Sequence, residues 1–160
     1  MTLQQLEYIY NFHDCDVFTP FEFVGDSVTV TFDLAKHLQY DDLKSRYGAL
    51  LQIKENALIA TVKFSNCLEL QVKEWDCCYS KSTKKTKKCN ERTISPELFD
   101  SDMDFISLAI SGENKIVFSF VKYGNPDKLS NIQFICQDID IMEEKLYTAS
   151  EYDKLCEKYE

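Results

Sequence analysis

The sequence predicts an α+β protein with a mainly antiparallel sheet built from successive hairpins and a C-terminal amphipathic helix. Two observations carry this prediction. Short apolar runs of period two follow one another with turn residues between them, and the last residues space their apolar positions as a helix does. No helical pattern separates the strands, so we expect hairpins rather than parallel crossovers. A chain of 160 residues without a linker-like stretch predicts a single domain, residues 1–160.

The first part of the chain contains a helical segment and a clear hairpin. Residues 3–10 place two leucines and Tyr10 near one face of a short N-terminal helix, although the aromatic and β-branched residues at 8–12 also allow a strand. The helix is the favoured interpretation. Residues 27–34 alternate apolar and polar side chains, and Gly25-Asp26 supplies the turn that joins them to residues 21–24. Residues 35–48 are polar and are expected to form a loop with a helical turn that ends at Gly48.

Two more hairpins are expected further along the chain. Residues 49–53 and 57–64 flank the turn Lys54-Glu55-Asn56, and residues 68–75 alternate as a strand. Residues 105–110 and 115–122 flank a turn at Ser111 to Asn114 and form the other hairpin.

The C-terminal part of the chain predicts a long strand and then the helix. Residues 129–142 alternate in two registers, which a β-bulge at Gln137-Asp138 would reconcile. Ser150 and Asp153 resemble a capping box, and the apolar residues that follow lie on one helical face.

The net charge of −9 is unevenly spread. Residues 80–92 hold six of the 18 basic residues and one apolar residue, Cys89, so we expect a mobile basic loop there. The rest of the chain has 26 acidic against 12 basic residues, a charge that attracts basic partners. Such a body repels nucleic acid and anionic membranes, so we expect neither as a partner.

The seven cysteines are expected to be reduced. Their number is odd, and residues 1–10 have neither the basic start nor the apolar run of a signal peptide, which predicts a cytoplasmic protein. Cys67 and Cys136 lie in apolar runs and are expected in the core. No apolar run reaches the roughly 18 residues of a membrane span.

The sequence offers one incomplete pattern of candidate catalytic residues. His13 and Asp14 are adjacent, as in an acid/base pair, and Cys15 lies nearby, but no oxyanion-binding turn follows them. A structural turn is the favoured interpretation of His13-Asp14. A hydrolase that uses them is kept as the second alternative, and we predict no catalytic residues.

Two metal-binding patterns are incomplete. Cys77, Cys78 and Cys89 lack the C-x₂-C spacing and the fourth ligand of a zinc site. The acidic run that starts at Asp100 imitates a calcium loop, but Phe105 stands where that loop requires glycine. We therefore predict neither a metal site nor a cofactor.

Phe12-His13-Asp14, the turn at Gly25-Asp26 and the segment 64–68 together resemble the layout of small bacterial immunity proteins of polymorphic or contact-dependent toxin systems. The resemblance covers roughly the first half of the chain. It implies a cytoplasmic, non-enzymatic protein that neutralises a cognate toxin, often a basic nuclease, by direct binding. That family shares no catalytic motif, so no residue role is carried over.

The predicted function is therefore binding of a basic protein partner such as a toxin domain. The first alternative is a small ligand-binding or regulatory domain of a bacterial cytosolic protein, with aromatic residues lining a pocket. The sequence leaves the oligomeric state open. The hypothesised contact residues are exposed acids near the hairpin ends: Asp100, Asp102, Asp104, Asp138, Asp140, Glu143 and Glu144.

Overall fold

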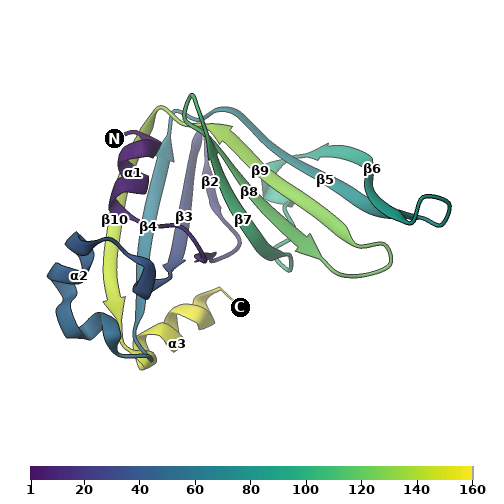
Figure 1. Cartoon of the computed structure of the whole chain (residues 1–160). Helices are drawn as coiled ribbons and strands as arrows, with labels where there is room; N and C mark the ends of the chain where they lie inside the picture. Colours follow the sequence, from purple (N-terminus) through teal and green to yellow (C-terminus); the bar gives the residue numbers. More distant parts are fainter. Residues whose placement is uncertain (160) are drawn as a thin grey trace. The chain divides into compact units, whose positions relative to one another are not determined.

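The computed structural model describes residues 1–159, which form two compact units where the sequence predicts a single domain (Figure 1). Unit 1 contains residues 1–66 and the chain from residue 137 onward, and unit 2 contains residues 67–136. Each unit has its own antiparallel sheet. The fold class predicted from the sequence is thus confirmed, with three α-helices beside sheets made from successive hairpins.

Unit 1 is a five-stranded sheet with helices. Its strands are β1 (Asp16–Val17), β2 (Glu22–Val24), β3 (Ser27–Leu34), β4 (Ala57–Ser65) and β10 (Asp138–Tyr147). They follow the order β1-β3-β4-β10, and β2 pairs with β3. Its α-helices are α1 (Leu3–Ile9), α2 (Asp41–Tyr47) and α3 (Ala149–Lys158), and its 3-10 helices are η1 (Lys36–Leu38) and η2 (Gly48–Gln52).

The two faces of this sheet differ because alternate side chains of a strand point to opposite sides. On the inner face Val30 lies opposite Val62 and Phe32 opposite Ala60, all buried. Leu6 of α1 and Leu43 of α2 are buried as well. The outer face carries threonines and charged residues. The helix α3 lies over it, because Tyr152 of α3 and Tyr159 just after it donate hydrogen bonds to outer residues of β3.

Unit 2 is a five-stranded sheet that consists of β5 (Leu68–Ser80), β6 (Lys85–Ile94), β7 (Asp104–Ser111), β8 (Lys115–Lys122) and β9 (Lys128–Ile135). The strand order is β6-β5-β9-β8-β7, and the 3-10 helix η3 (Pro96–Leu98) lies between β6 and β7 in the chain. Phe118 and Ile132 lie opposite each other in the buried face, beside Val72 of β5.

Several predicted elements are confirmed. The N-terminal helix forms as α1, with a capping box between Thr2 and Gln5. The hairpin around Gly25-Asp26 forms as β2 and β3, and the one around residues 111–114 forms as β7 and β8. Cys67 and Cys136 are buried.

Three local predictions are wrong. Residues 49–53 lie largely in η2 and pair with no strand, so the hairpin around Lys54-Glu55-Asn56 does not form. Residues 129–142 are two strands, because β9 ends in one sheet and β10 belongs to the other; the register shift lies between Ile141 and Glu143. The capping box of α3 joins Thr148 to Glu151 rather than Ser150 to Asp153.

The predicted mobile loop at residues 80–92 is also a strand over much of its length. β6 pairs with β5 from Ile94 to Lys85, and the turn between them is short. A disulfide joins Cys78 to Cys89, so the expectation of reduced thiols is wrong at these two positions. Disulfide-bonded cysteines have no thiolate with which to bind zinc. Backbone pairing and this covalent link organise a segment that has almost no apolar side chain to bury.

Among residues 1–159, no helix is both long and apolar enough to cross a membrane.

Candidate functional site

The outer face of the unit 1 sheet combines hydroxyl and carboxylate groups. Thr31 of β3 lies opposite Thr61 of β4, and Glu143 of β10 lies opposite Thr61 on its other side. Glu22 of β2 lies opposite Thr29, the next residue of β3 on the same face. Four neighbouring strands thus place polar side chains on one face.

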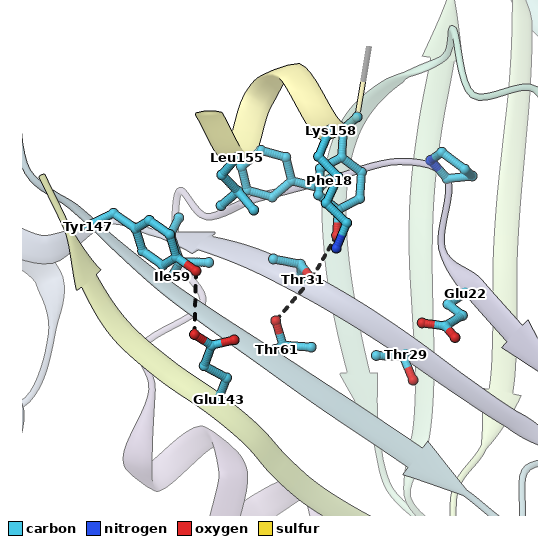
Figure 2. Close-up of a pocket in the computed structure, with 12 residues that line it drawn as sticks. Phe18, Glu22, Thr29, Thr31, Ile59, Thr61, Glu143, Tyr147, Leu155 and Lys158 are labelled. Atoms are coloured by element: carbon cyan, nitrogen blue, oxygen red, sulfur yellow. Dashed lines mark hydrogen bonds between the residues drawn. The ribbon is translucent and has the colours of Figure 1, made fainter. Parts of the chain in front are cut away.

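A cavity of about 330 Å³ lies between this face and α3. We call it the threonine pocket. In Figure 2 the side chains of Leu155 and Lys158 on α3 lie over the threonines, and Glu22 and Glu143 lie on either side of them. The lining residues are Phe18, Pro20, Glu22, Thr29, Thr31, Ile59, Thr61, Glu143, Tyr147, Leu155, Lys158 and Tyr159.

Hydrogen bonds position the groups that line the pocket. The hydroxyls of Thr31 and Thr61 are 3.1 Å apart, and the Tyr159 hydroxyl lies 3.2 Å from that of Thr31. The Tyr147 hydroxyl donates to Glu143 at 3.5 Å. Glu143 remains exposed and can accept further hydrogen bonds from a ligand.

The helix α3 is held on the sheet by aromatic and polar contacts. The rings of Phe18 and Tyr159 have centroids 4.9 Å apart, and the Tyr152 hydroxyl donates to Asp33 at 2.7 Å. Burial raises the pKa of Asp33, an effect that the Tyr152 hydrogen bond opposes and nearby Asp16 reinforces. These contacts form one wall of the pocket.

The composition of the pocket suits a cationic group. Two carboxylates and three threonine hydroxyls accept hydrogen bonds from an ammonium or guanidinium group, and the aromatic rings offer faces to the same charge. Lys158, whose Nζ lies 5.7 Å from the Tyr159 ring centroid, already brings one cation to this site.

Glu144, one of the seven hypothesised contact acids, has a different environment. The prediction that it is exposed is wrong, because the register shift in β10 turns it to the inner face, where its side chain is 12% exposed. It accepts hydrogen bonds from Tyr10 at 2.8 Å, Tyr47 at 2.6 Å and both terminal nitrogens of Arg46 at 2.6 and 2.9 Å. Glu144 therefore joins α1, α2 and β10.

The other six acids divide between the two units. Asp138, Asp140 and Glu143 are exposed in unit 1, and Asp138 accepts a hydrogen bond from Asn66 at 2.6 Å. Asp102 and Asp104 are exposed in unit 2. Beside them, Asp100 pairs with Lys122 at 2.7 Å, and this bond lowers the pKa of the Asp100 carboxyl. The structure thus gathers four of the seven acids in unit 1, three of them exposed, and Glu143 lines the pocket.

The formal charge is segregated between the units. Unit 1 has 17 acidic against 8 basic residues, and unit 2 has 10 of each, so the whole net charge of −9 belongs to unit 1. The sequence shows the same residues but not which of them share a unit. It also gives no reason to select Glu22, Thr29 and Thr61, although the alternation of Thr29 and Thr31 with valines marks one polar strand face.

The residues considered for catalysis form an exposed turn. His13 Nδ1 and Asp14 Oδ2 are 3.2 Å apart, and the two side chains are 76% and 70% exposed. Asp14 has a φ of 57°, which a turn requires. Burial, reinforced by Asp16, raises the pKa of the Cys15 thiol to about 12 and keeps it protonated near neutral pH, which opposes a role as nucleophile.

No protein-family model, no curated protein and no solved structure matches this chain. The fold and its surfaces define an α+β protein with two antiparallel units, one of them strongly acidic and bearing a polar pocket.

Proposed function

We propose that this protein binds a basic protein partner through the outer face of unit 1, in the manner of an immunity protein that neutralises a basic toxin domain. The observation that carries the proposal is the segregation of charge, since all nine net negative charges belong to unit 1. A concentrated charge steers a partner of opposite sign and raises the rate of association.

The threonine pocket supplies a specific contact within this acidic face. A lysine or arginine side chain of the partner enters it and meets Glu22 and Glu143. The threonine hydroxyls accept its remaining hydrogen bonds, and Phe18 and Tyr147 contact its apolar stem. Buried contacts of this kind slow dissociation, whereas the surrounding exposed acids act on association.

The test begins with capture of the partner on the tagged full chain by chemical cross-linking, followed by mass spectrometry. The association rate of the purified partner is then measured at about 50 mM and about 500 mM salt, because screening acts on exposed charges. We expect the rate to fall with salt, and the Asp140→Lys, Glu143→Lys double variant to reduce it about tenfold or more at low salt.

The matched control reverses two exposed acids of unit 2, in the Asp102→Lys, Asp104→Lys double variant. It makes the same change in net charge, so it separates a local effect from a general one. An association rate that the two double variants change equally contradicts the proposed site, and a captured partner with a net negative charge contradicts the proposed function.

The volume of the threonine pocket also favours a second candidate, a small cationic ligand rather than a protein. Thermal unfolding in the presence of amines, guanidines and amino acids tests it. Stabilisation that Thr61→Val removes and that Thr93→Val, on a strand of unit 2, retains supports this candidate.

A further inference from the structure

The lysine-rich end of β5 and β6 is a two-stranded ribbon that extends past the rest of its sheet (Figure 1). Pairing between β5 and β9 ends at Asp76 opposite Lys128, and the Cys77 amide then donates to Asp127. Beyond that point β5 pairs with β6 alone, up to Ser80 opposite Lys85. We call residues 77–88 the basic ribbon.

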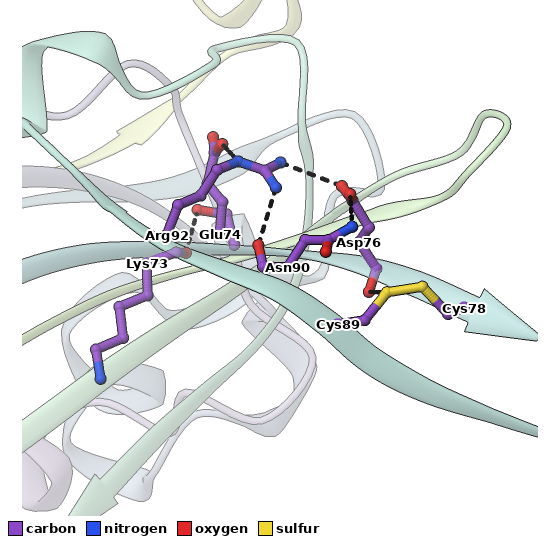
Figure 3. A network of polar contacts seen from close by, with 8 residues as sticks. Lys73, Glu74, Asp76, Cys78, Cys89, Asn90 and Arg92 are labelled. Carbon is purple, nitrogen blue, oxygen red and sulfur yellow. Dashed lines mark hydrogen bonds and ion pairs between the residues drawn. A yellow bond between two sulfur atoms is a disulfide. The ribbon is translucent and has the colours of Figure 1, made fainter.

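The base of the basic ribbon is held by a polar network and a disulfide (Figure 3). Arg92 donates to Glu74 at 3.3 Å and to Asp76 at 3.2 Å, and Asn90 donates to Asp76 at 3.0 Å. The disulfide between Cys78 and Cys89 links the strands next to this network. A free two-stranded hairpin is marginally stable in water, so these links make the ribbon a fixed projection.

The charge of the basic ribbon is entirely positive. It contains five lysines and no acidic residue, and all five are exposed. Lys85 and Lys87 lie opposite Ser80 and Cys78 and point to one face, whereas Lys88, opposite Cys77, points to the other. Lys81 and Lys84 lie in the turn, so the ribbon carries positive charge on both faces and at its tip.

Protection of an exposed edge accounts for only part of this pattern. Lysines on an edge strand prevent it from pairing with another chain, and β6 is an edge strand. That role concerns β6 alone and gives no reason for Lys81 and Lys84 in the turn.

We propose that the basic ribbon binds double-stranded nucleic acid by entering a groove and contacting the phosphates on both sides. The major groove of a DNA duplex admits a two-stranded β-ribbon, and its two phosphate backbones flank whatever enters it. Lysines on both faces and at the tip match that arrangement. A flat acidic protein surface would meet one face only, so the duplex is the better fit.

The expectation that the chain repels nucleic acid treats its acidic residues as one body with a basic loop. The structure assigns the whole excess of acidic residues to unit 1. Unit 2 has no net charge, and its ribbon concentrates five of its ten basic residues in twelve positions. The inference rests on unit 2 and is independent of the function proposed for unit 1.

Trp75 provides a fluorescence signal at the base of the ribbon. It is the single tryptophan of the chain, its Nε1 donates to Glu91 at 3.2 Å, and Lys88 Nζ lies 4.3 Å from its ring centroid. A phosphate that takes Lys88 away from the ring changes the emission of Trp75.

The experiment titrates the disulfide-intact full chain with a fluorescent DNA duplex of about 20 base pairs and follows anisotropy and Trp75 emission. We expect saturable binding that weakens about 100-fold between 50 and 200 mM salt, as roughly four phosphate contacts require. The variant with Lys84, Lys85, Lys87 and Lys88 changed to Gln should lose most of this affinity and of the salt dependence.

The matched control removes four lysines outside the ribbon by changing Lys44, Lys54, Lys63 and Lys115 to Gln. Equal loss in the two quadruple variants, or no binding by the natural chain at 50 mM salt, overturns the proposal. Poly-glutamate of similar charge is a second probe. If poly-glutamate binds the ribbon as tightly as the duplex does and displaces the duplex, the partner is an acidic polypeptide and the proposal is wrong.

Discussion

At the residue scale, the Glu144 carboxylate stabilises the fold by holding distant segments of the chain together. Its two oxygens accept four hydrogen bonds from Tyr10, Arg46 and Tyr47, on two segments far from it in sequence. Burial by itself would raise the pKa of Glu144, but these bonds outweigh it, so the pKa lies below its usual value. Removing the carboxylate leaves the donors without their partner.

We predict that Glu144→Ala lowers the free energy of unfolding by about 2 kcal/mol, a value reduced because Arg46 is half exposed. Urea denaturation at pH 7 measures it. Glu143→Ala is the control, since this neighbouring carboxylate is exposed and has one long hydrogen bond, and should change stability by about 0.5 kcal/mol or less. Equal losses in the two variants contradict the assigned role.

The pH dependence of the same residue has a defined sign. A carboxyl group whose pKa is lowered by folding stabilises the protein above its unfolded pKa, and this contribution is lost as the pH falls through the folded value. The difference in stability between the natural chain and Glu144→Ala should therefore shrink as the pH falls below about 4.5. A difference that stays constant down to pH 3 contradicts this linkage.

At the scale of the element, the start of α3 determines how that helix covers the threonine pocket. In its capping box the Thr148 side chain accepts from the Glu151 amide, and the Thr148 amide donates to the Glu151 carboxylate at 2.9 Å. Thr148→Ala removes the first of these bonds. We predict that Thr148→Ala costs about 1 kcal/mol and weakens the contacts of Tyr152 and Tyr159 with the sheet. Hydrogen exchange of the α3 amides measures it. Ser150→Ala, inside the helix, should leave exchange unchanged, and a larger effect there contradicts the assigned cap.

The basic ribbon is the second element, and its stabilisation by the disulfide can be tested. A disulfide that closes a loop of about ten residues is worth roughly 3 kcal/mol, so Cys78→Ser should open the ribbon more often. Trypsin cleaves after lysine, and we expect cleavage within residues 81–88 to become about tenfold faster or more. Cys77→Ser is the control because Cys77 is a free thiol. Equal rates in both variants contradict the stabilising role of the disulfide.

At the scale of the whole molecule, two surfaces of opposite charge lie in different units. The effects of substitutions that share no partner residues add, so each surface should respond only to its own substitutions. We predict that the quadruple glutamine variant of the ribbon binds a basic partner as the natural chain does. The Asp140→Lys, Glu143→Lys variant should bind a DNA duplex at least as tightly. Binding assays with both ligands on both variants measure this, and loss of both activities in either variant contradicts it.

Much of the fold is predictable because local patterns reflect local backbone preferences. The alternation in β3 and the turns at Gly25 and Gly112 identify hairpins without tertiary information. The strand β6 is not predictable in this way, because its lysines carry no apolar period and its pairing depends on β5. The position of Glu144 escapes prediction as well, since one extra residue in β10 reverses which face it points to.

The sequence by itself determined the α+β class, the terminal helices, several strands and the excess of acidic residues, because these follow from spacing and composition. The tertiary structure decided which acids are free, how the charge divides between units, which threonines form a pocket and how the lysine-rich segment pairs. Those features depend on register and on contacts between residues up to 134 positions apart in the chain, and local pattern carries no information about such distances.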